Sequence, residues 1–163
     1  MIAAETNCKV ICDFRIQDVA LNGQGAPLVP IGDKLLFNDY DFCLNLGGFA
    51  NISFADKDQR VAFDICPVNI ILNHIAALRQ KDFDDQGALG RAGLVDNSLL
   101  KELNDLHYYR LSLPKSLSRE WMEREFLPLL EQSGLSPEDK AATVYKHISE
   151  QLMKVFNQYQ LNI

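Results

Sequence analysis

Asp18 and the glycine-rich loop that follows it are the residues of this chain best suited to chemistry on a sugar or a phosphate. The loop, residues 22–30, reads Asn-Gly-Gln-Gly-Ala-Pro-Leu-Val-Pro. Glycines in such a loop let backbone N–H groups approach a ligand where a Cβ atom would collide. A carboxylate beside the loop could take the proton from an attacking hydroxyl or water. On sequence alone, however, an Asp in this position is more often a turn-forming residue.

A second glycine pair, Gly47-Gly48, lies between two apolar runs and is followed by Asn51. Two glycines after a strand can direct their backbone amides at phosphate oxygens. A tight hairpin turn is the simpler explanation of the pair. The sequence therefore gives two candidate backbone-exposing loops, each with a plain structural alternative.

Three polar residues further along the chain could contact a substrate. Asp64 and Asn69 lie where a strand-like run gives way to a helical one, so each could equally cap the helix. Arg119 carries a guanidinium that can fork onto a carboxylate, or it could pair with Glu120 or Glu123 on a solvated face.

Composition excludes several classes of protein. The chain has 163 residues, about one domain, and 47% of them are hydrophobic. A formal net charge of −6 with scattered basic residues argues against a nucleic acid or an anionic membrane as partner. There is no signal peptide and no long apolar run, so a cytoplasmic location is expected. Four cysteines without CxxC spacing and three separated histidines predict free thiols and no metal site.

The elements that must position these residues fall into two groups. The first half predicts short strands over residues 10–14, 42–46, 51–55 and 60–65, the last three forming an antiparallel meander. The second half predicts helices after Pro67, over residues 84–92, 97–106 and 120–130, and from Ser136-Pro137 onward. Pro128 is expected to kink or end the helix that contains it. An α/β fold with more helix than strand follows.

The glycine motifs together resemble the anhydro-N-acetylmuramic acid kinases, members of the actin/Hsp70/sugar-kinase superfamily. Residues 13–30 follow the family pattern DFR-x-x-D-[IV]-A-x-G-G-Q-G-A-P-L-V-P, departing at Asn22, where Gly is usual; Asn also tolerates left-handed backbone angles. Residues 45–52 follow N-[IL]-G-G-x-A-N-[IL]. A third motif, G-F-D-T-G-P-G-N, keeps Asp64 and Asn69 but loses its glycines.

The resemblance implies a fold and a division of the chain. The expected fold is the ribonuclease H-like, actin-like ATPase fold, present in part as a three-stranded antiparallel meander followed by a helical half. Residues 1–40 would be the tail of the first half-domain, carrying the catalytic Asp loop. Residues 41–163 would be the start of the second half-domain.

The resemblance also implies an activity and roles for the candidate residues. The activity is that of an ATP-dependent kinase that opens the anhydro ring of 1,6-anhydro-N-acetylmuramic acid with water and phosphorylates it to the 6-phosphate. Asp18 would be the base, and Mg²⁺ would bridge the phosphates of ATP. The cofactor-binding residues would be Gly47, Gly48 and Asn51. The substrate-binding residues would be Gln24, Gly25, Asp64, Asn69 and Arg119.

The implied setting is peptidoglycan recycling in the bacterial cytoplasm. The partners would be the amino sugar and ATP, with no nucleic acid and no membrane, and a homodimer is compatible with the family. The family's N-terminal phosphate loop and its adenosine-binding segment are not found in this sequence, so the chain alone is expected to be weak or inactive. The alternatives are a non-catalytic sugar-binding module, or an assembly module with an exposed apolar patch at Tyr108, Tyr109, Leu111, Leu113 and Trp121.

Overall fold

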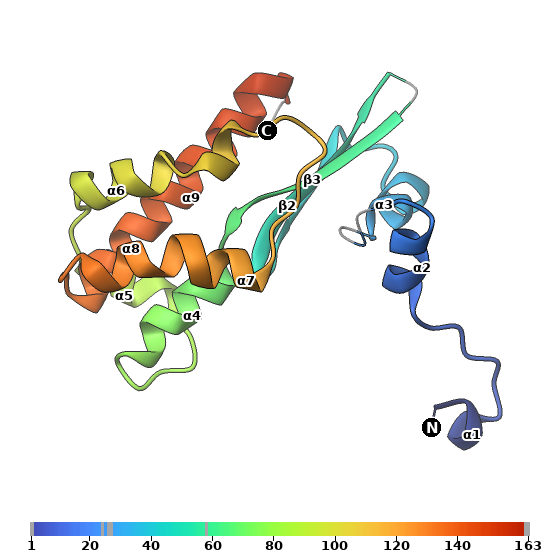
Figure 1. Cartoon of the computed structure of the whole chain (residues 1–163), viewed down its shortest axis with the longest axis horizontal. Coiled ribbons are helices and arrows are strands. Elements are labelled where there is room, and N and C mark those ends of the chain that lie inside the picture. The colour runs from blue at the N-terminus through green and yellow to red at the C-terminus, as the bar shows by residue number, and fades with distance from the viewer. Residues whose placement is uncertain (1, 24, 26–27, 58, 162–163) are drawn as a thin grey trace.

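The computed structural model describes residues 2–23, 25, 28–57 and 59–161. Three short helices come first: α1 (Ile2–Thr6), α2 (Phe14–Ala20) and α3 (Pro30–Leu36). An antiparallel sheet follows: β1 (Phe42–Leu46), β2 (Phe49–Asp56) and β3 (Gln59–Pro67), in the order β1-β2-β3. The remainder is helical: α4 (Asn69–Ala77), α5 (Ala88–Ala92), α6 (Asn97–Asn104), α7 (Arg119–Trp121), α8 (Leu127–Gln132) and α9 (Pro137–Tyr159), with 3-10 turns at Asp85–Gly87 and His107–Arg110 (Figure 1).

The predicted α/β class and the meander are confirmed. In the hairpin between β1 and β2, Leu46 pairs with Ala50, so Gly47, Gly48 and Phe49 make the connection. Between β2 and β3 the register shifts, because Ala50 opposes Cys66 while Asn51 opposes Asp64. One residue of β3 is therefore a β-bulge, which bends the strand and re-aims the side chains beside it.

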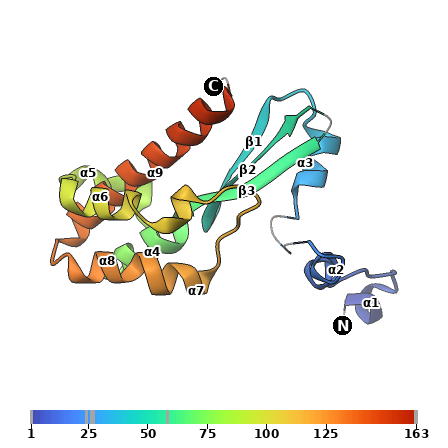
Figure 2. The same ribbon diagram turned by 45° about the horizontal axis from the view of Figure 1, so that its top comes forward.

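The two faces of the sheet have different partners. Side chains alternate along each strand, and the apolar set faces α9, where Phe42 lies against Phe156 and Phe54 lies against Tyr159. The helical half of the chain lies on that side of the sheet, whereas α3 packs against β3 from the other side (Figure 2). The core thus lies between the sheet and the helices that follow it. The second face of the sheet, on the side of α3, lies outside this core.

The strand predicted over residues 10–14 is wrong. Residues 9–13 have no regular structure, and Phe14 begins α2 instead. Asp13 adopts a left-handed backbone conformation with φ 61°, which is incompatible with an extended strand, and the sheet offers this segment no neighbour. None of α1, α2 and α3 contributes a buried residue; Phe14, for example, is 58% exposed.

The start of α9 and the interruption by Pro128 agree with the sequence. The hydroxyl of Ser136 caps α9 by accepting a hydrogen bond from the Asp139 N–H at 3.1 Å. Helices α7 and α8 are separated by a π-helical turn over Met122–Phe126, directly before Leu127 and Pro128. Since proline cannot donate to the preceding turn, an expanded turn is a common way to accommodate it. None of the helices in the described part of the chain combines the length and apolarity that a membrane span requires.

A buried histidine connects α9 to the helices around it. His147 is fully buried, with its Nε2 2.9 Å from the hydroxyl of Tyr109 and its Nδ1 2.9 Å from Oδ1 of Asn104. Burial, aided by the positive charge of Lys154, lowers the pKa of His147 to about 3. The imidazole is therefore neutral in the folded chain across the physiological range.

This pKa predicts a dependence of stability on pH. The unfolded chain binds a proton at His147 below about pH 6.5, whereas the folded chain does not. The free energy of unfolding should therefore fall by about 1.4 kcal/mol per pH unit as the pH drops from about 6.5 toward 3. Chemical denaturation at pH 7.0 and pH 5.5 measures the slope. His147→Gln should flatten it and His74→Gln should not; a slope that survives His147→Gln would contradict the assignment.

Candidate functional site

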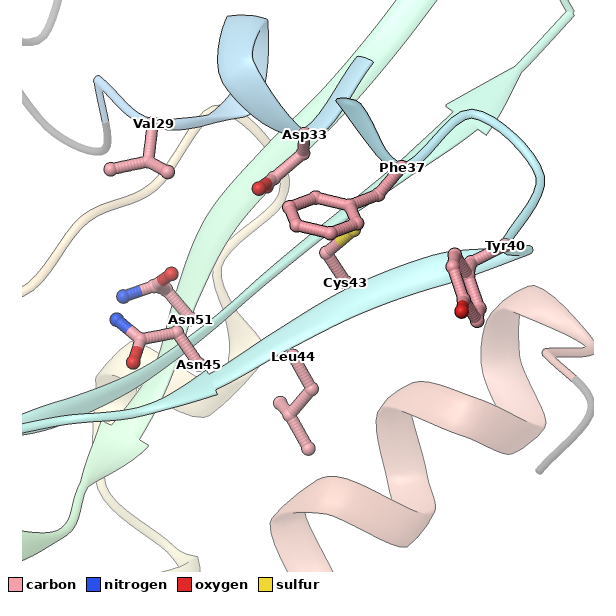
Figure 3. Close-up of a pocket in the computed structure, with 8 residues that line it drawn as sticks. All are labelled: Val29, Asp33, Phe37, Tyr40, Cys43, Leu44, Asn45 and Asn51. Carbon is pink, nitrogen blue, oxygen red and sulfur yellow. The ribbon is translucent and has the colours of Figure 1, made fainter. Parts of the chain in front are cut away.

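A row of polar side chains crosses the sheet on the face away from α9. Asn45 on β1 is opposite Asn51 on β2, and Asn51 is opposite Asp64 on β3. Residues directly opposite in an antiparallel pair share a face, so the three side chains lie side by side. Figure 3 shows Asn45 and Asn51 pointing the same way, into the space below Val29. Two of these three side chains, Asn45 and Asn51, line a pocket.

That pocket lies between the sheet and the segment that carries α3. It has a volume of about 380 Å³ and is lined by Val29, Asp33, Phe37, Tyr40, Cys43, Leu44, Asn45 and Asn51 (Figure 3). The carboxylate of Asp33 accepts a short hydrogen bond from the hydroxyl of Ser53, which also accepts one from Arg60 at 2.9 Å. These contacts fix α3 over the sheet, so the pocket has a polar floor and an apolar cover.

Asp64 is the most constrained member of the polar row. Its Oδ2 accepts a hydrogen bond from the Leu117 N–H at 2.8 Å, and its backbone oxygen accepts one from the Tyr108 hydroxyl at 2.6 Å. Burial raises the pKa of Asp64, while the Leu117 N–H and the charge of Arg15 act in the opposite direction. Asp64 therefore joins β3 to the segment before α7.

The Gly47-Gly48 hairpin does not need glycine for its own conformation. Neither glycine has a positive φ. A Cβ atom on Gly47 would come no closer than 3.5 Å to a neighbour, and one on Gly48 no closer than 3.8 Å, which are ordinary contacts. Among the described residues, neither backbone N–H donates to a protein acceptor. The plain hairpin-turn explanation therefore leaves both the glycines and their free amides unexplained.

The carbonyl groups of the same hairpin are fully engaged by the start of α4. The N–H groups of Val68 and Ile70 donate to Gly48 O, and that of Asn69 donates to Gly47 O, at 2.9 to 3.2 Å. The side-chain amide of Asn69 also donates to Leu46 O at 2.9 Å and to Gly47 O at 3.0 Å. Because the carbonyls are held by α4, the hairpin amides must point outward. In this chain Asn69 fixes the hairpin, and its contact with a substrate stays a prediction.

Removing the Asn69 side chain should loosen this hairpin. Asn69→Ala deletes two partly solvated hydrogen bonds, so we expect the free energy of unfolding to fall by about 1 kcal/mol. Asn73→Ala is the matched control, because Asn73 is exposed on the same helix and alanine favours helix. Urea denaturation of the two variants and the parent measures the difference. Equal denaturation midpoints for Asn69→Ala and Asn73→Ala would show that the hydrogen bonds of Asn69 contribute nothing to stability.

Asp18 lies on α2 and holds the loop that follows it. Its Oδ2 accepts a hydrogen bond from the Gly25 N–H at 2.7 Å. Asn22 has φ 68° and Gly25 has φ 70°, so Asn does replace glycine in a left-handed position, as the sequence suggests. Gln24 lies outside the described residues. The turn-supporting role considered for Asp18 is thus present, and its catalytic role stays a prediction.

The pocket beside Asp18 and the pocket above the polar row share one lining residue, Val29. Asp18 lines a second pocket, of about 550 Å³, together with Phe14, Gln17, Leu21, Leu28, Val29, Pro30 and Ile31. Val29 also lines the pocket above Asn45 and Asn51. The charge of Arg15, on α2, acts on Asp64. Helix α2 and the polar row therefore lie on the same side of the sheet, as a shared cleft requires.

Arg119 is placed apart from these residues. It starts α7, its side chain is 75% exposed, and its Nε lies 2.8 Å from Oε1 of Glu123, the solvated pairing considered from sequence.

The apolar patch predicted for an assembly module is wrong in part, because Tyr108 is buried against Trp121. The described chain has no disulfide, but only Cys66 of the four thiols is buried, and burial raises its pKa to about 12.

Sequence reasoning missed Asn45 and Asp33. Alternation along residues 42–46 places Asn45 on the face opposite the apolar side chains, and a polar residue there is an available signal. The contribution of Asp33 depends on how α3 packs against β3, for which the sequence carries no signal. Among the described residues, no three His, Cys, Asp or Glu side chains gather as a metal site would need.

Comparisons with known proteins agree on one family. A family model described as anhydro-N-acetylmuramic acid kinase matches residues 1–162. A curated protein of that name from Shewanella baltica is 35% identical over 99% of this chain and 47% of its own length. One from Pseudomonas syringae pv. tomato is 38% identical over 88% of the chain and 42% of its own length. The chain spans about half the length of the curated relatives it matches.

Proposed function

The chain belongs to the anhydro-N-acetylmuramic acid kinase family, and we propose that it supplies one part of the active site of such an enzyme. The family name implies a kinase and thus the use of ATP. The proposed reaction is the opening of 1,6-anhydro-N-acetylmuramic acid by water with transfer of the γ-phosphoryl group, giving the 6-phosphate for cell-wall recycling in the bacterial cytoplasm. The proposed fold is the actin-like ATPase fold, of which the meander and helices are a portion.

The Gly47-Gly48 hairpin is the observation that carries this proposal. Its two amides have no protein acceptor in the described chain, and its glycines leave open the space that a Cβ would fill. Phosphoryl transfer depends on positioned N–H donors that meet the phosphate oxygens. We assign the hairpin amides to the phosphates of ATP, with Asn51 in the adjoining row as a side-chain donor.

Asp18 is assigned the role of general base. The water oxygen forms a bond to the anomeric carbon as the bond from that carbon to the anhydro oxygen breaks. That oxygen takes the γ-phosphoryl group, whose bond to ADP breaks, and the proton of the water goes to the Asp18 carboxylate. Asp64, Asn69, Gly25 and Gln24 are assigned to the sugar side. Arg119 is a weaker candidate for binding the lactyl carboxylate of the sugar. To bind that carboxylate, its guanidinium would have to leave Glu123.

Magnesium fits this arrangement as an ion carried by the nucleotide. Mg²⁺ in kinases keeps several waters and is held by substrate phosphates with one or two carboxylates. Asp33 and Asp18 line pockets on the side of the sheet where the phosphates would bind, so their carboxylates are candidates to hold the ion.

The proposed division at residue 40 is supported by burial. Helices α1, α2 and α3 bury no residue, whereas the core is built from residues that follow β1. Val19 and Leu21 are 55% and 74% exposed, and Leu35 and Leu36 on α3 are exposed as well. Apolar surface of this extent is normally covered. We therefore assign residues 1–40 to a preceding half-domain and residues 41–163 to the next one.

A chimeric enzyme tests the proposal. Residues 1–162 replace the matching half of the Shewanella baltica relative, and formation of the sugar 6-phosphate is followed with ATP and Mg²⁺. We expect product from the chimera and none from the isolated chain, because a site that depends on positioning cannot work from one part. A folded chimera that forms no product would contradict the assigned activity. Micromolar binding of ATP to the isolated chain, measured by calorimetry, would contradict the division of the site.

A further inference from the structure

A third cavity, distinct from the two pockets described above, lies on the opposite face of the sheet from the polar row. Its volume is about 530 Å³, and it is lined by Ile65, Tyr109, Lys115, Gln151, Lys154, Val155, Asn157 and Gln158. These residues come from β3, from the segment before α7 and from the last turns of α9. Because α9 covers the apolar face, this cavity is separated by the sheet from the proposed phosphoryl-transfer site.

The charge of the cavity is opposite to that of the chain. The chain has a net charge of −6, yet the lining holds two lysines and no carboxylate. The ion pairs formed by the described residues include neither Lys115 nor Lys154. Two ammonium groups without a carboxylate partner in one concave surface attract an anion.

Lys115 is held in place before any ligand arrives. Its Nζ lies 4.9 Å from the ring centroid of Tyr108 and 5.6 Å from that of Phe63, so cation–π contacts orient the ammonium group. Burial lowers the pKa of Lys115. A partly desolvated ammonium gains more from an anion than a solvated one does, because the local dielectric constant is lower.

Lys154 and two amides complete the cavity from α9. The charge of Lys154 reaches the interior, since it contributes to the lowered pKa of His147. Asn157 and Gln158 are exposed and line the same cavity, and their amide groups both donate and accept hydrogen bonds. Val155 and Ile65 supply apolar wall. This combination suits a ligand with one anionic end and several hydroxyl groups.

We propose that this cavity binds a phosphate monoester of a small polyol, such as a sugar phosphate. Lys115 and Lys154 hold the phosphate dianion, and Asn157 and Gln158 hydrogen-bond the hydroxyl groups. The site is separate from the phosphoryl-transfer site, so its occupancy does not depend on Asp18. Its position beside Tyr109 and Gln151 places a bound ligand against the network of His147.

Amide chemical-shift titrations of the 163-residue chain test this inference. The probes are glucose 6-phosphate, inorganic phosphate and glucose. We expect saturable shifts at residues 109–115 and 151–158 with glucose 6-phosphate, weaker ones with inorganic phosphate and none with glucose. Lys154→Gln and Lys115→Met should each raise the dissociation constant of glucose 6-phosphate by about tenfold or more, as the loss of a charged hydrogen bond does. Methionine keeps an apolar chain over the two rings.

Lys146→Gln is the matched control, since Lys146 lies on the same helix and pairs with Glu150 outside the cavity. It should leave the dissociation constant of glucose 6-phosphate unchanged. The inference is overturned by an absence of saturable shifts, by equal binding of glucose, or by an equal effect of Lys146→Gln, which would indicate net charge alone. If Lys115→Met does not fold, the exposed Lys154 decides the outcome.

Discussion

Asp18→Asn in the chimeric enzyme is expected to lower turnover by ~10²- to 10⁴-fold while leaving the Michaelis constant nearly unchanged. Asparagine cannot accept the proton of the attacking water. It can still accept the hydrogen bond that Gly25 N–H donates to Oδ2 of Asp18, so the loop should keep its shape. Steady-state rates of product formation at varied sugar concentration separate the two parameters.

Asp13→Asn is the control for this substitution. Asp13 lies directly before α2, and among the described residues its carboxylate accepts no hydrogen bond from the backbone N–H groups of that helix. Asparagine also tolerates the left-handed conformation found there, with φ 61°. Asp13→Asn should therefore keep full turnover. Near-full turnover in Asp18→Asn would leave Asp18 as a residue that only holds its loop.

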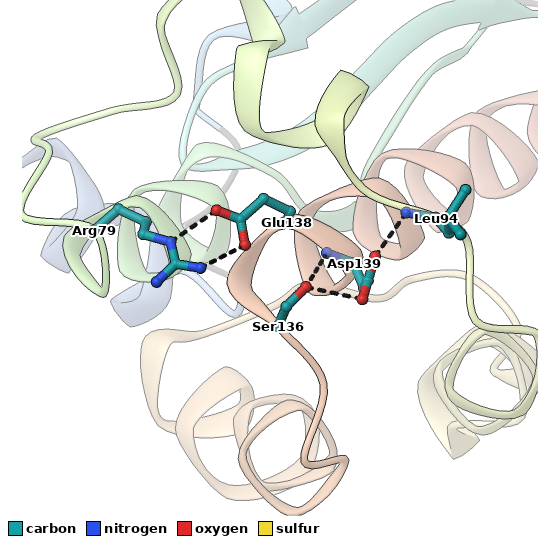
Figure 4. Close-up of polar contacts among 5 residues, drawn as sticks. All are labelled: Arg79, Leu94, Ser136, Glu138 and Asp139. Carbon is teal, nitrogen blue, oxygen red and sulfur yellow. Dashed lines mark hydrogen bonds and ion pairs between the residues drawn. The ribbon is translucent and has the colours of Figure 1, made fainter.

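Gly93→Ala is expected to destabilise the chain by about 3 kcal/mol, because the added methyl group would push the backbone at residue 93 away from the first turn of α9. A Cβ atom on Gly93 would overlap the carbonyl group of Glu138 and lie 2.6 Å from Asp139 N. Figure 4 shows the contacts that hold these segments together: Leu94 N–H donates to Asp139, and Arg79 pairs with Glu138 at 2.7 Å. A loss of this size should lower the melting temperature by roughly 6 to 12 °C.

Gly32→Ala is the matched substitution without a clash. Gly32 lies in α3, and a Cβ there meets no atom within 4 Å. Alanine is favoured over glycine in a helix by up to about 1 kcal/mol, so the melting temperature should stay equal or rise. Thermal unfolding of both variants by circular dichroism provides the comparison. A melting temperature of Gly93→Ala within about 2 °C of the parent would contradict the close packing of α9 against the segment after α5.

The meander and the long final helix could be predicted because their signals are local. Residues 42–46 alternate apolar and polar side chains, a charged turn separates β2 from β3, and Ser136-Pro137 provides a cap and a helix start. The three-stranded sheet and α9 form where these signals place them. The family motifs add the positions of Asp18 and the glycine pair.

The remaining features depend on tertiary contacts. Residues 10–14 are β-rich in composition, but in the described structure they pair with no strand and form an irregular segment and the first turn of α2. The polar row needs the register of three strands and a bulge beside Asp64, and a shift of one residue would send its side chains to the other face. Tyr108 looked available for assembly, but its hydroxyl donates to Asp64 O within the core.

A crystal structure of the chimeric enzyme with a non-hydrolysable ATP analogue tests most directly whether Asp18 and the hairpin face one bound sugar. The water that Asp18 activates and the γ-phosphate that the anhydro oxygen attacks must both be positioned against the same sugar ring. We predict the amides of Gly47 and Gly48 within about 3 Å of phosphate oxygens, with the Asp18 carboxylate facing the same cleft. Phosphates bound away from the hairpin, or Asp18 and the hairpin on opposite faces of the enzyme, would contradict the proposed active site.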